Sequence, residues 1–419
     1  MTEDLGMKMV GHRTADGRGR AIGNLGRHGP AIAALLAMSE RLVIGRLTIV
    51  LPDGSQRVVE GENPGPAATI VLRNGRIMRR YMTGGAVGFA ESFLDGDWDS
   101  PDLSTLLELL DRNQDAWGTS YYGSTLNRAI RRLQHAFRTN TKHGSRRNIH
   151  AHYDLGNDFF ASWLDPTMLY SAAAFVDGTK ELAEAQLAKC RRLLKMIGAG
   201  PGQRLLEIGS GWGTFAILAA KEYGMKVTSL TISQEQLTYA RRRVAEEGLN
   251  EQVEIRFQDY RDVEGQFDKI ASIEMFEAVG ESYWRTFFDK LRACLTPDGA
   301  AGLQIITIAD DHFSEYRRTP DFIQRYIFPG GMLPSPSILK SVSRSAGLQE
   351  TDSITFGGDY ARTLGLWRER FDLAWSSIVE RGFDERFRRI WTYYLAYCEA
   401  GFRTGSIDVV QTVMRPSQG

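Results

Sequence analysis

Hydrophobic and polar positions follow two different patterns along the chain, and these patterns divide it into two parts. Between residues 46 and 74, short β-branched runs are broken by Asp53-Gly54 and followed by Asn74-Gly75, dipeptides that are typical of hairpin turns. Apolar residues then recur at helical spacing in two segments, 85–93 and 104–113. The first part of the chain is therefore predicted to be a small α+β domain at residues 29–115.

From residue 185 onward, helical patterns alternate with strand-like runs that begin at positions 204, 226, 253, 269 and 300. Such alternation is typical of right-handed crossovers between parallel strands. We therefore expect an α/β domain at residues 151–419, built on a doubly wound, Rossmann-like sheet. The final stretch of the chain is predicted to be helical.

Composition excludes some classes of protein. Of 419 residues, 42% are hydrophobic and 24% charged, the balance of a folded globular chain. Lys and Arg number 51, as do Asp and Glu, and this zero net charge argues against a dedicated nucleic-acid binder. The charge is unevenly distributed, however. Residues 1–150 hold 20 basic and 15 acidic side chains, whereas residues 151–419 hold 31 basic and 36 acidic ones.

Residues 1–28 are rich in Gly and Arg, so we expect a flexible N-terminus.

A basic linker is predicted at residues 116–150. The chain carries seven Lys or Arg and no acidic residue from Ala116 to Tyr153, and Arg128, Arg131 and Arg132 recur near helical spacing. One interpretation is contact with an anionic membrane surface, and the alternative is an ordinary solvated linker helix. From the residues of this segment alone, the solvated linker helix is the favoured interpretation.

Other sequence signals bear on location and metal binding. The three cysteines, Cys190, Cys294 and Cys398, show no metal-ligand or disulfide spacing, so we expect no metal site. No apolar run reaches the ~20 residues that a bilayer-spanning helix needs, and the N-terminus lacks the apolar core of a signal peptide. We therefore expect a cytoplasmic protein.

The strongest local motif is LEIGSGWG at residues 206–213, which lies between a predicted buried strand and a helix. Its glycines permit a sharp turn and close approach of the backbone to a ligand. With Glu207 two residues before the first glycine, it resembles motif I of the class I S-adenosylmethionine (SAM) methyltransferases. Thr231 and Gln236, at the end of the next strand, can hydrogen-bond to ribose hydroxyls.

Several motifs in order resemble the family of cyclopropane-fatty-acyl-phospholipid synthases and their mycolic-acid relatives. They are HYDLGNDFF at 152–160, LDP at 164–166, YS at 170–171, EIGSGWG, TISQEQ at 231–236, QDYRD at 258–262, MFEAVG at 275–280, YIFPGG at 326–331, FGGDY at 356–360 and the segment 387–402. Together they extend from about residue 150 to 410. The GDWD sequence at 96–99 looks like part of the small N-terminal domain of the phospholipid-acting members.

The resemblance implies a reaction and a set of site residues. SAM gives its methyl group to a cis double bond of a phospholipid acyl chain, a carbocation forms on the neighbouring carbon, and loss of a proton from the new methyl closes a cyclopropane. The cofactor-binding positions carried over, together with Glu207 of motif I, are Tyr170, Ser171, Gly209, Gly211, Thr231, Gln236, Tyr260 and Arg261. The family also holds a bicarbonate as the base. The matching positions are Glu277, Ile306 (through its backbone), Tyr360 and Gln304.

Some positions depart from the family pattern. Ala172 stands where the family has Cys, and Gln304 where it has His, which weakens the expectation that bicarbonate is used. Cys398 matches a cysteine that has been considered catalytic in the family. Because the mechanism needs no covalent thiolate, we expect Cys398 to line the pocket rather than to act as a nucleophile.

The first expectation for function is therefore a cyclopropane synthase that works on phospholipid at the inner face of the membrane, with residues 151–419 as its catalytic domain. For an enzyme whose substrate lies in a bilayer, membrane contact becomes the favoured interpretation of the basic linker. A homodimer is the assembly that the resemblance suggests. A fatty-acid C-methyltransferase, which makes methyl-branched or methylated unsaturated chains, is the alternative that Ala172 and Gln304 favour. Methylation of a small molecule and a catalytically inactive lipid-binding protein are alternatives from other classes. The intact glycine loop and Glu277 argue against an inactive protein.

Overall fold

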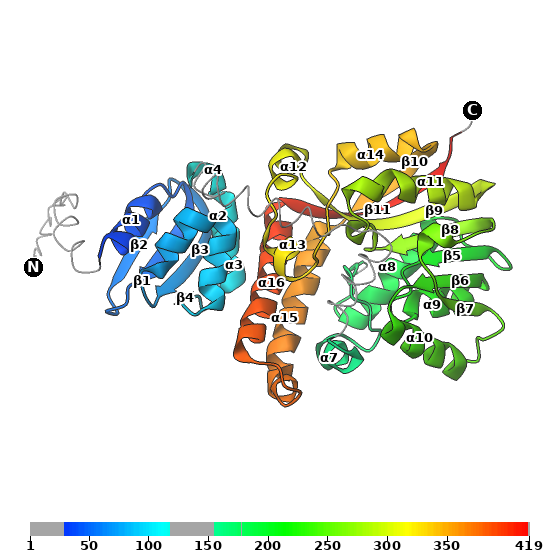
Figure 1. Cartoon of the computed structure of the whole chain (residues 1–419), viewed down its shortest axis with the longest axis horizontal. Coiled ribbons are helices and arrows are strands. Elements are labelled where there is room, and N and C mark those ends of the chain that lie inside the picture. The colour runs from blue at the N-terminus through cyan, green and yellow to red at the C-terminus, as the bar shows by residue number, and fades with distance from the viewer. Residues whose placement is uncertain (1–28, 118–154, 177, 418–419) are drawn as a thin grey trace, which may run out of the picture.

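The structure is a computed structural model that describes residues 29–117, 155–176 and 178–417 (Figure 1). Three sequence predictions lie outside these residues: the flexible N-terminus, most of the basic linker with Arg128, Arg131 and Arg132, and the start of the motif at 152–160. Within the described part of the chain, no helix is long and apolar enough to cross a membrane. The same residues contain no group of three or more His, Cys, Asp or Glu placed to hold a metal ion.

The N-terminal domain is a four-stranded sheet with helices packed on it. Its elements are α1 (Gly29–Ser39), β1 (Ile44–Val50), β2 (Gln56–Glu60), β3 (Asn63–Leu72), α2 (Arg76–Leu94), β4 (Trp98–Asp99), α3 (Leu103–Arg112) and α4 (Gln114–Trp117). The strand order is β2-β1-β3-β4. The turn at Asp53-Gly54 joins β1 and β2 as an antiparallel hairpin, as predicted.

The hairpin predicted at Asn74-Gly75 is wrong. β3 is parallel to β1, and the chain leaves β3 through these two residues directly into helix α2. The helix was expected to begin at Gly85, but it begins at Arg76, because Ile77, Met78 and Tyr81 already bury an apolar face against the sheet. A turn dipeptide predicts where a strand ends but not which element follows it.

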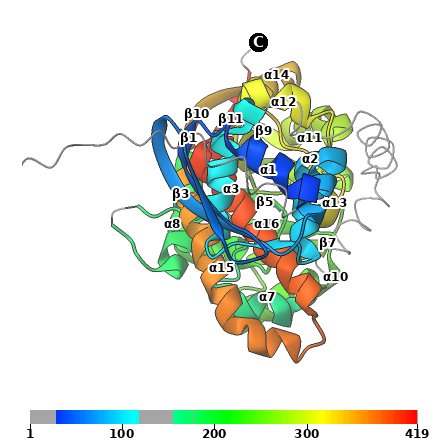
Figure 2. The ribbon, with the colours of Figure 1, turned by 90° about the vertical axis from the view of Figure 1, so that its left-hand side faces the viewer.

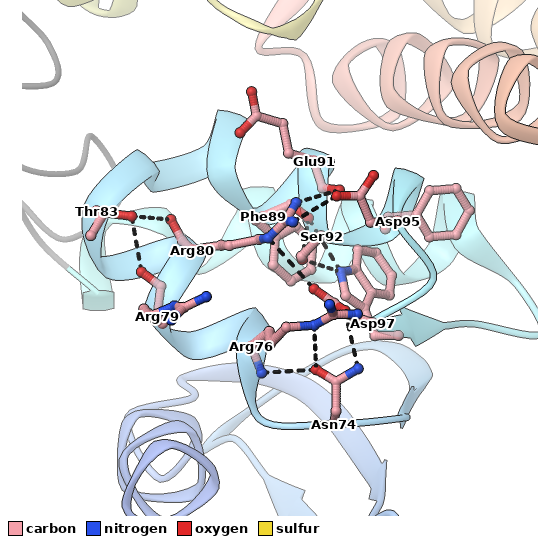
Figure 3. A network of polar contacts seen from close by, with 12 residues as sticks. Asn74, Arg76, Arg79, Arg80, Thr83, Phe89, Glu91, Ser92, Asp95 and Asp97 are labelled. Carbon is pink, nitrogen blue, oxygen red and sulfur yellow. Dashed lines mark hydrogen bonds and ion pairs between the residues drawn. The ribbon is translucent and has the colours of Figure 1, made fainter.

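Helix α2 contains a kink at Gly85, whose φ of 56° and ψ of −146° lie in a region open essentially to glycine alone. A polar network fixes the two halves of the helix to each other (Figure 3). The Arg80 side chain, from the first half, donates to the backbone oxygen of Glu91 at 3.1 Å and pairs with Asp95 at 2.6 Å. The buried Asp97 accepts from Asn74 at 3.0 Å.

We expect Gly85→Ala to lower the free energy of unfolding by about 1–3 kcal/mol, because an L side chain is strained at this φ and ψ. Urea unfolding followed by circular dichroism measures the change. Gly358→Ala is the matched control, since a Cβ at Gly358 meets no atom within 4 Å and its φ is ordinary. Equal stability of the two variants would contradict the strain argument.

The catalytic domain contains a seven-stranded sheet of order β10-β11-β9-β8-β5-β6-β7. The strands are β5 (Arg204–Ile208), β6 (Lys226–Thr231), β7 (Val253–Phe257), β8 (Phe267–Ile273), β9 (Leu295–Ile308), β10 (Leu348–Thr355) and β11 (Ile407–Pro416). Strands β5 to β9 are parallel, which confirms the predicted α/β fold. The sequence prediction missed β10 and β11, and β11 runs antiparallel to both of its neighbours.

Helices cover both faces of this sheet, and a long helical hairpin extends beside it (Figure 1). The helices are α7 (Asn157–Trp163), α8 (Leu182–Met196), α9 (Thr214–Tyr223), α10 (Gln234–Glu246), α11 (Trp284–Cys294), α12 (Asp310–Tyr316), α13 (Phe322–Tyr326), α14 (Pro336–Ser345), α15 (Gly357–Val379) and α16 (Glu385–Thr404). The hairpin consists of α15 and α16, which lie between the sheet and the N-terminal domain.

The N-terminal domain packs on α16, chiefly through α3 (Figures 1 and 2). Arg389 of α16 donates to the backbone oxygens of Phe93 at 2.6 Å and Trp98 at 3.0 Å. The Ser104 hydroxyl of α3 donates to the buried Glu399 carboxylate at 2.6 Å. Because these polar contacts are specific in direction, they fix how the two domains sit against each other.

Candidate active site

A large apolar cavity lies at the carboxyl ends of β5, β6 and β8 and continues past α16 into the N-terminal domain. This is the end at which open α/β sheets bind their ligands. The cavity wall includes most of the residues that the sequence singled out, namely Tyr170, Ser171, Glu207, Gly209, Gly211, Thr231, Gln236, Tyr260, Arg261, Glu277, Ile306, Tyr360 and Cys398. The exception is Gln304, which is completely buried behind the wall.

The glycine loop joins β5 to α9 as a tight turn. Gly209, Gly211 and Gly213 all have positive φ, at 101°, 48° and 88°. These angles are costly for other residues, so the loop needs its glycines, and the cavity reaches its backbone directly. Glu207, just before the loop, accepts a hydrogen bond from the Ser229 hydroxyl, and burial raises its pKa to about 8.

The predicted nucleoside contacts lie on the same side of the cavity and are held by their own hydrogen bonds. The Thr231 hydroxyl donates to the Gln236 side-chain oxygen at 3.0 Å. The Arg261 guanidinium donates to both carboxylate oxygens of Asp259, at 2.8 and 2.7 Å. Asp259 therefore orients Arg261 within the wall. The loop and these side chains suit a nucleoside ligand such as that of SAM.

Tyr170 and Ser171 also line the cavity, where each is held by a buried partner. The hydroxyls of Tyr170 and Tyr394 are 2.7 Å apart, and the Tyr170 ring packs against Trp163 and Trp367. The ammonium of the completely buried Lys189 donates to the Ser171 hydroxyl. The aromatic faces near Tyr170 are able to stabilise a cation in the cavity.

A glutamate that the sequence analysis did not select, Glu274, stands at the centre of the polar groups in the cavity. One carboxylate oxygen accepts from the Ala172 backbone N–H and from the Gln304 amide, each at 2.8 Å. The other accepts from the Tyr360 hydroxyl at 2.7 Å. Its φ of 49° is unusual for a residue with a side chain, and such strain is typical of functional positions.

Hydrogen-bond donors and a nearby ammonium group favour the ionised form of Glu274. A backbone N–H and an amide NH₂ can only donate, so the side chain that they surround is favoured as the anion. Burial raises the pKa of Glu274, and the Lys189 ammonium is the largest of the influences that oppose this rise. These contacts favour a carboxylate in a dry site, and the raised pKa makes that carboxylate a stronger base.

Glu277 has a different environment, although it is only three residues away. Its Oε1 accepts from the Ile306 backbone N–H at 2.5 Å, whereas its Oε2 is buried without a hydrogen-bond partner among the described residues. Burial, and secondly the charge of Glu274, raises the pKa of Glu277 to about 8. A pKa of about 8 favours the neutral form of Glu277 near pH 7, whereas the donors and the Lys189 ammonium favour the ionised form of Glu274. Two carboxyl groups in such different environments suit different roles.

The remaining predicted residues support these carboxyl groups or line the cavity. Gln304 is a positioning residue: its amide donates to Glu274, and its side-chain oxygen accepts from Gln411 at 2.9 Å. Burial raises the pKa of the Cys398 thiol far above its usual value. Cys398 is thus a thiol rather than a thiolate, which suits a lining residue and not a nucleophile.

The residues present do not fit a bicarbonate. The resemblance implies that Ala172, Gln304 and Tyr360 stand at positions around that anion. In this chain all three donate to the carboxylate of Glu274 instead. A sequence signal for Glu274 did exist, because residues 274 and 277 are two glutamates directly after a buried strand. Only the fold shows which of the two meets Ala172, 102 positions away in the chain.

Comparison with known proteins decides the family. The model of the mycolic acid cyclopropane synthetase family matches residues 140–412. The chain belongs to this family. It is a SAM-dependent methyltransferase of the cyclopropane synthase type.

Two curated relatives cover most of the chain. Tuberculostearic acid methyltransferase UfaA1 of Mycobacterium tuberculosis is 40% identical over 400 residues, which are 91% of this chain and 92% of the relative. The cyclopropane-fatty-acyl-phospholipid synthase of Escherichia coli is 36% identical over 352 residues, 84% of this chain and 88% of the relative. Among solved structures, mycolic acid cyclopropane synthase CmaA1 complexed with SAH and CTAB is 32% identical, with a TM-score of 0.60 over 64% of this chain and 97% of that one.

Proposed function

We propose that this enzyme transfers the methyl group of SAM to a cis double bond in a phospholipid acyl chain and releases a methyl-branched, unsaturated chain. The observation that carries the proposal is the Glu274 carboxylate, which is held by Ala172, Gln304 and Tyr360 in an apolar cavity. Glu274 is thus a base that the protein itself supplies, in place of a bound bicarbonate. The proposal thus favours the C-methyltransferase alternative over the cyclopropane synthase that the sequence put first.

The proposed steps use few groups. The π electrons of the alkene form a bond to the SAM methyl carbon, SAM leaves as S-adenosylhomocysteine, and the neighbouring chain carbon becomes a cation. The Glu274 carboxylate then takes a proton from a carbon next to the cation, and the electrons of that C–H bond form the new double bond. The aromatic side chains around Tyr170 stabilise the cation, and the apolar cavity excludes water that would trap it.

The two products differ in which proton the base removes. A proton from the new methyl gives a cyclopropane, whereas a proton from the chain gives a branched alkene. Three donors from different parts of the fold fix Glu274, so it can reach only a restricted set of protons. The 40% identity to a tuberculostearic acid methyltransferase adds support, because tuberculostearic acid is a methyl-branched fatty acid.

The test is to incubate the purified protein with SAM and vesicles of dioleoyl phosphatidylglycerol and to analyse the fatty acid methyl esters. We expect a product that is heavier by one methylene, retains alkene protons in its NMR spectrum and is hydrogenated to a saturated methyl-branched chain. Both products have the same mass, so the NMR spectrum is the deciding measurement. Upfield ring protons without alkene protons would overturn the branched product in favour of cyclopropane.

The proposal places the enzyme at a membrane surface, as a peripheral protein, since its substrate lies in the bilayer. The basic linker is the predicted contact with anionic lipid. Salt weakens surface electrostatics, so the binding to anionic vesicles is expected to decline as ionic strength rises. Vesicle sedimentation with Arg128, Arg131 and Arg132 replaced by Ala serves as the comparison.

A further inference from the structure

We propose that the interior of the N-terminal domain receives the methyl end of the acyl chain and so selects chain length. This inference rests on the proposed function only in taking an acyl chain as the substrate. It does not depend on which product forms.

The cavity that contains Glu274 continues into the N-terminal domain. On the catalytic side its wall passes along Phe328, Tyr394 and Cys398. On the other side, apolar residues from every layer of the N-terminal domain line it. They are Leu35 of α1, Leu47 of β1, Ile70 of β3, Met78 of α2 and Leu107 of α3, each at most 8% exposed. An apolar space between the sheet and its helices suits a hydrocarbon chain.

The kink in α2 forms part of this wall. Ile77 and Tyr81, before Gly85, and Val87 and Phe89, after it, all line the cavity. The network of Arg80 and Asp95 holds the two halves of the helix together (Figure 3). Because a polar network holds the kink, the apolar residues of α2 keep their places in the cavity wall. This favours a preformed cavity over loose packing.

The distribution of polar residues around the cavity indicates where each end of the acyl chain lies. Its polar lining residues Asp111, Gln114, His312 and Glu315 are partly exposed, and they lie where α3 and α4 meet α12. The side chains of Gln114 and His312 are 3.3 Å apart across this boundary. The ester and headgroup need water and polar partners, whereas the methyl end needs neither. The headgroup therefore lies at this rim, and the methyl end lies among the apolar residues inside.

The first experiment fills the far end of the cavity. Ile70 of β3 lines it, whereas the adjacent Val71 does not, because successive side chains on a strand face opposite sides. Ile70→Phe is the test and Val71→Phe the matched control. Mixed vesicles carry palmitoleoyl and oleoyl chains on one headgroup. These chains share the distance from ester to double bond and differ only at the methyl end.

We expect Ile70→Phe to shift the ratio of methylation toward palmitoleoyl by about tenfold. A pocket with less room for methylenes disfavours the longer oleoyl chain. Val71→Phe is expected to keep the wild-type ratio, and both variants should bind S-adenosylhomocysteine normally. An unchanged ratio in a folded Ile70→Phe variant, or an equal shift in both variants, would overturn the proposal. The ratio is read from total methyl transfer, so it stays interpretable if the product proves to be a cyclopropane.

A second measurement uses the unaltered protein and covers the case in which Ile70→Phe does not fold. Phosphatidylglycerol with a photoreactive diazirine at the methyl end of an oleoyl chain is bound and irradiated, and the labelled peptides are identified by mass spectrometry. Labels on peptides of β1, β3 and α2 are expected. A diazirine near the ester should instead label peptides of α12. Labelling by the methyl-end probe in the catalytic domain alone would refute the assignment.

Discussion

Glu274→Gln is expected to lower the rate of product formation by about 10³-fold, the contribution typical of a positioned general base. Gln has nearly the same shape but cannot accept a proton from carbon at neutral pH. It also turns an NH₂ group toward donors that now surround a carboxylate. The rate is measured as methylated fatty acid formed from vesicles in the presence of SAM. Titration calorimetry with S-adenosylhomocysteine should give an affinity within about twofold of wild type, because Glu274 is placed as a base and not as a cofactor ligand.

A companion variant separates loss of a base from general damage. Glu274→Gly removes the carboxylate and leaves its donors in place, so added formate should restore part of the rate in a concentration-dependent way. Formate should have no such effect on Glu274→Gln, which still fills the space. A Glu274→Gln enzyme that keeps more than about a tenth of wild-type activity would rule out Glu274 as the base.

Glu277→Gln is expected to stabilise the protein increasingly as pH rises from about 5 to about 8. Burial, with the charge of Glu274 as the second cause, raises the pKa of Glu277 from 4.5 to about 8. Between those values the native protein keeps a proton that the unfolded chain has released. The free energy of unfolding of wild type therefore falls as pH rises through this window. Gln does not titrate, so the variant avoids a loss on the order of 3 kcal/mol.

Thermal unfolding at several pH values measures this effect. The advantage of Glu277→Gln over wild type should be smallest near pH 5 and should grow toward pH 8. Glu251→Gln is the control, since it makes the same change of side chain at an exposed position. A difference for Glu277→Gln that is constant across the range would mean that Glu277 is ionised in the native protein. Glu274 and Glu277 would then no longer be distinguishable by charge.

The sequence patterns correctly predicted elements whose partners follow one another along the chain. The alternation after residue 185 predicted β5 to β9, and the glycine loop appeared between a strand and a helix as expected. Strand β11 was missed, because it pairs with β9 about a hundred residues earlier and lies antiparallel in a mostly parallel sheet. The Asn74-Gly75 hairpin was wrong for a related reason. A dipeptide fixes a turn, whereas the partner of the next segment is fixed by packing elsewhere.

The sequence by itself determined the family, the use of SAM and a set of residues that line the cavity, because these depend on residue types in a fixed order along the chain. It also marked Ala172 and Gln304 as departures. Only the tertiary structure decided what compensates for them. Ala172, Glu274, Gln304 and Tyr360 come from distant segments, and hydrogen bonds of 2.7–2.8 Å join three of them to one carboxylate. The charge of a buried carboxyl group depends on such neighbours in space and not on its neighbours in the chain.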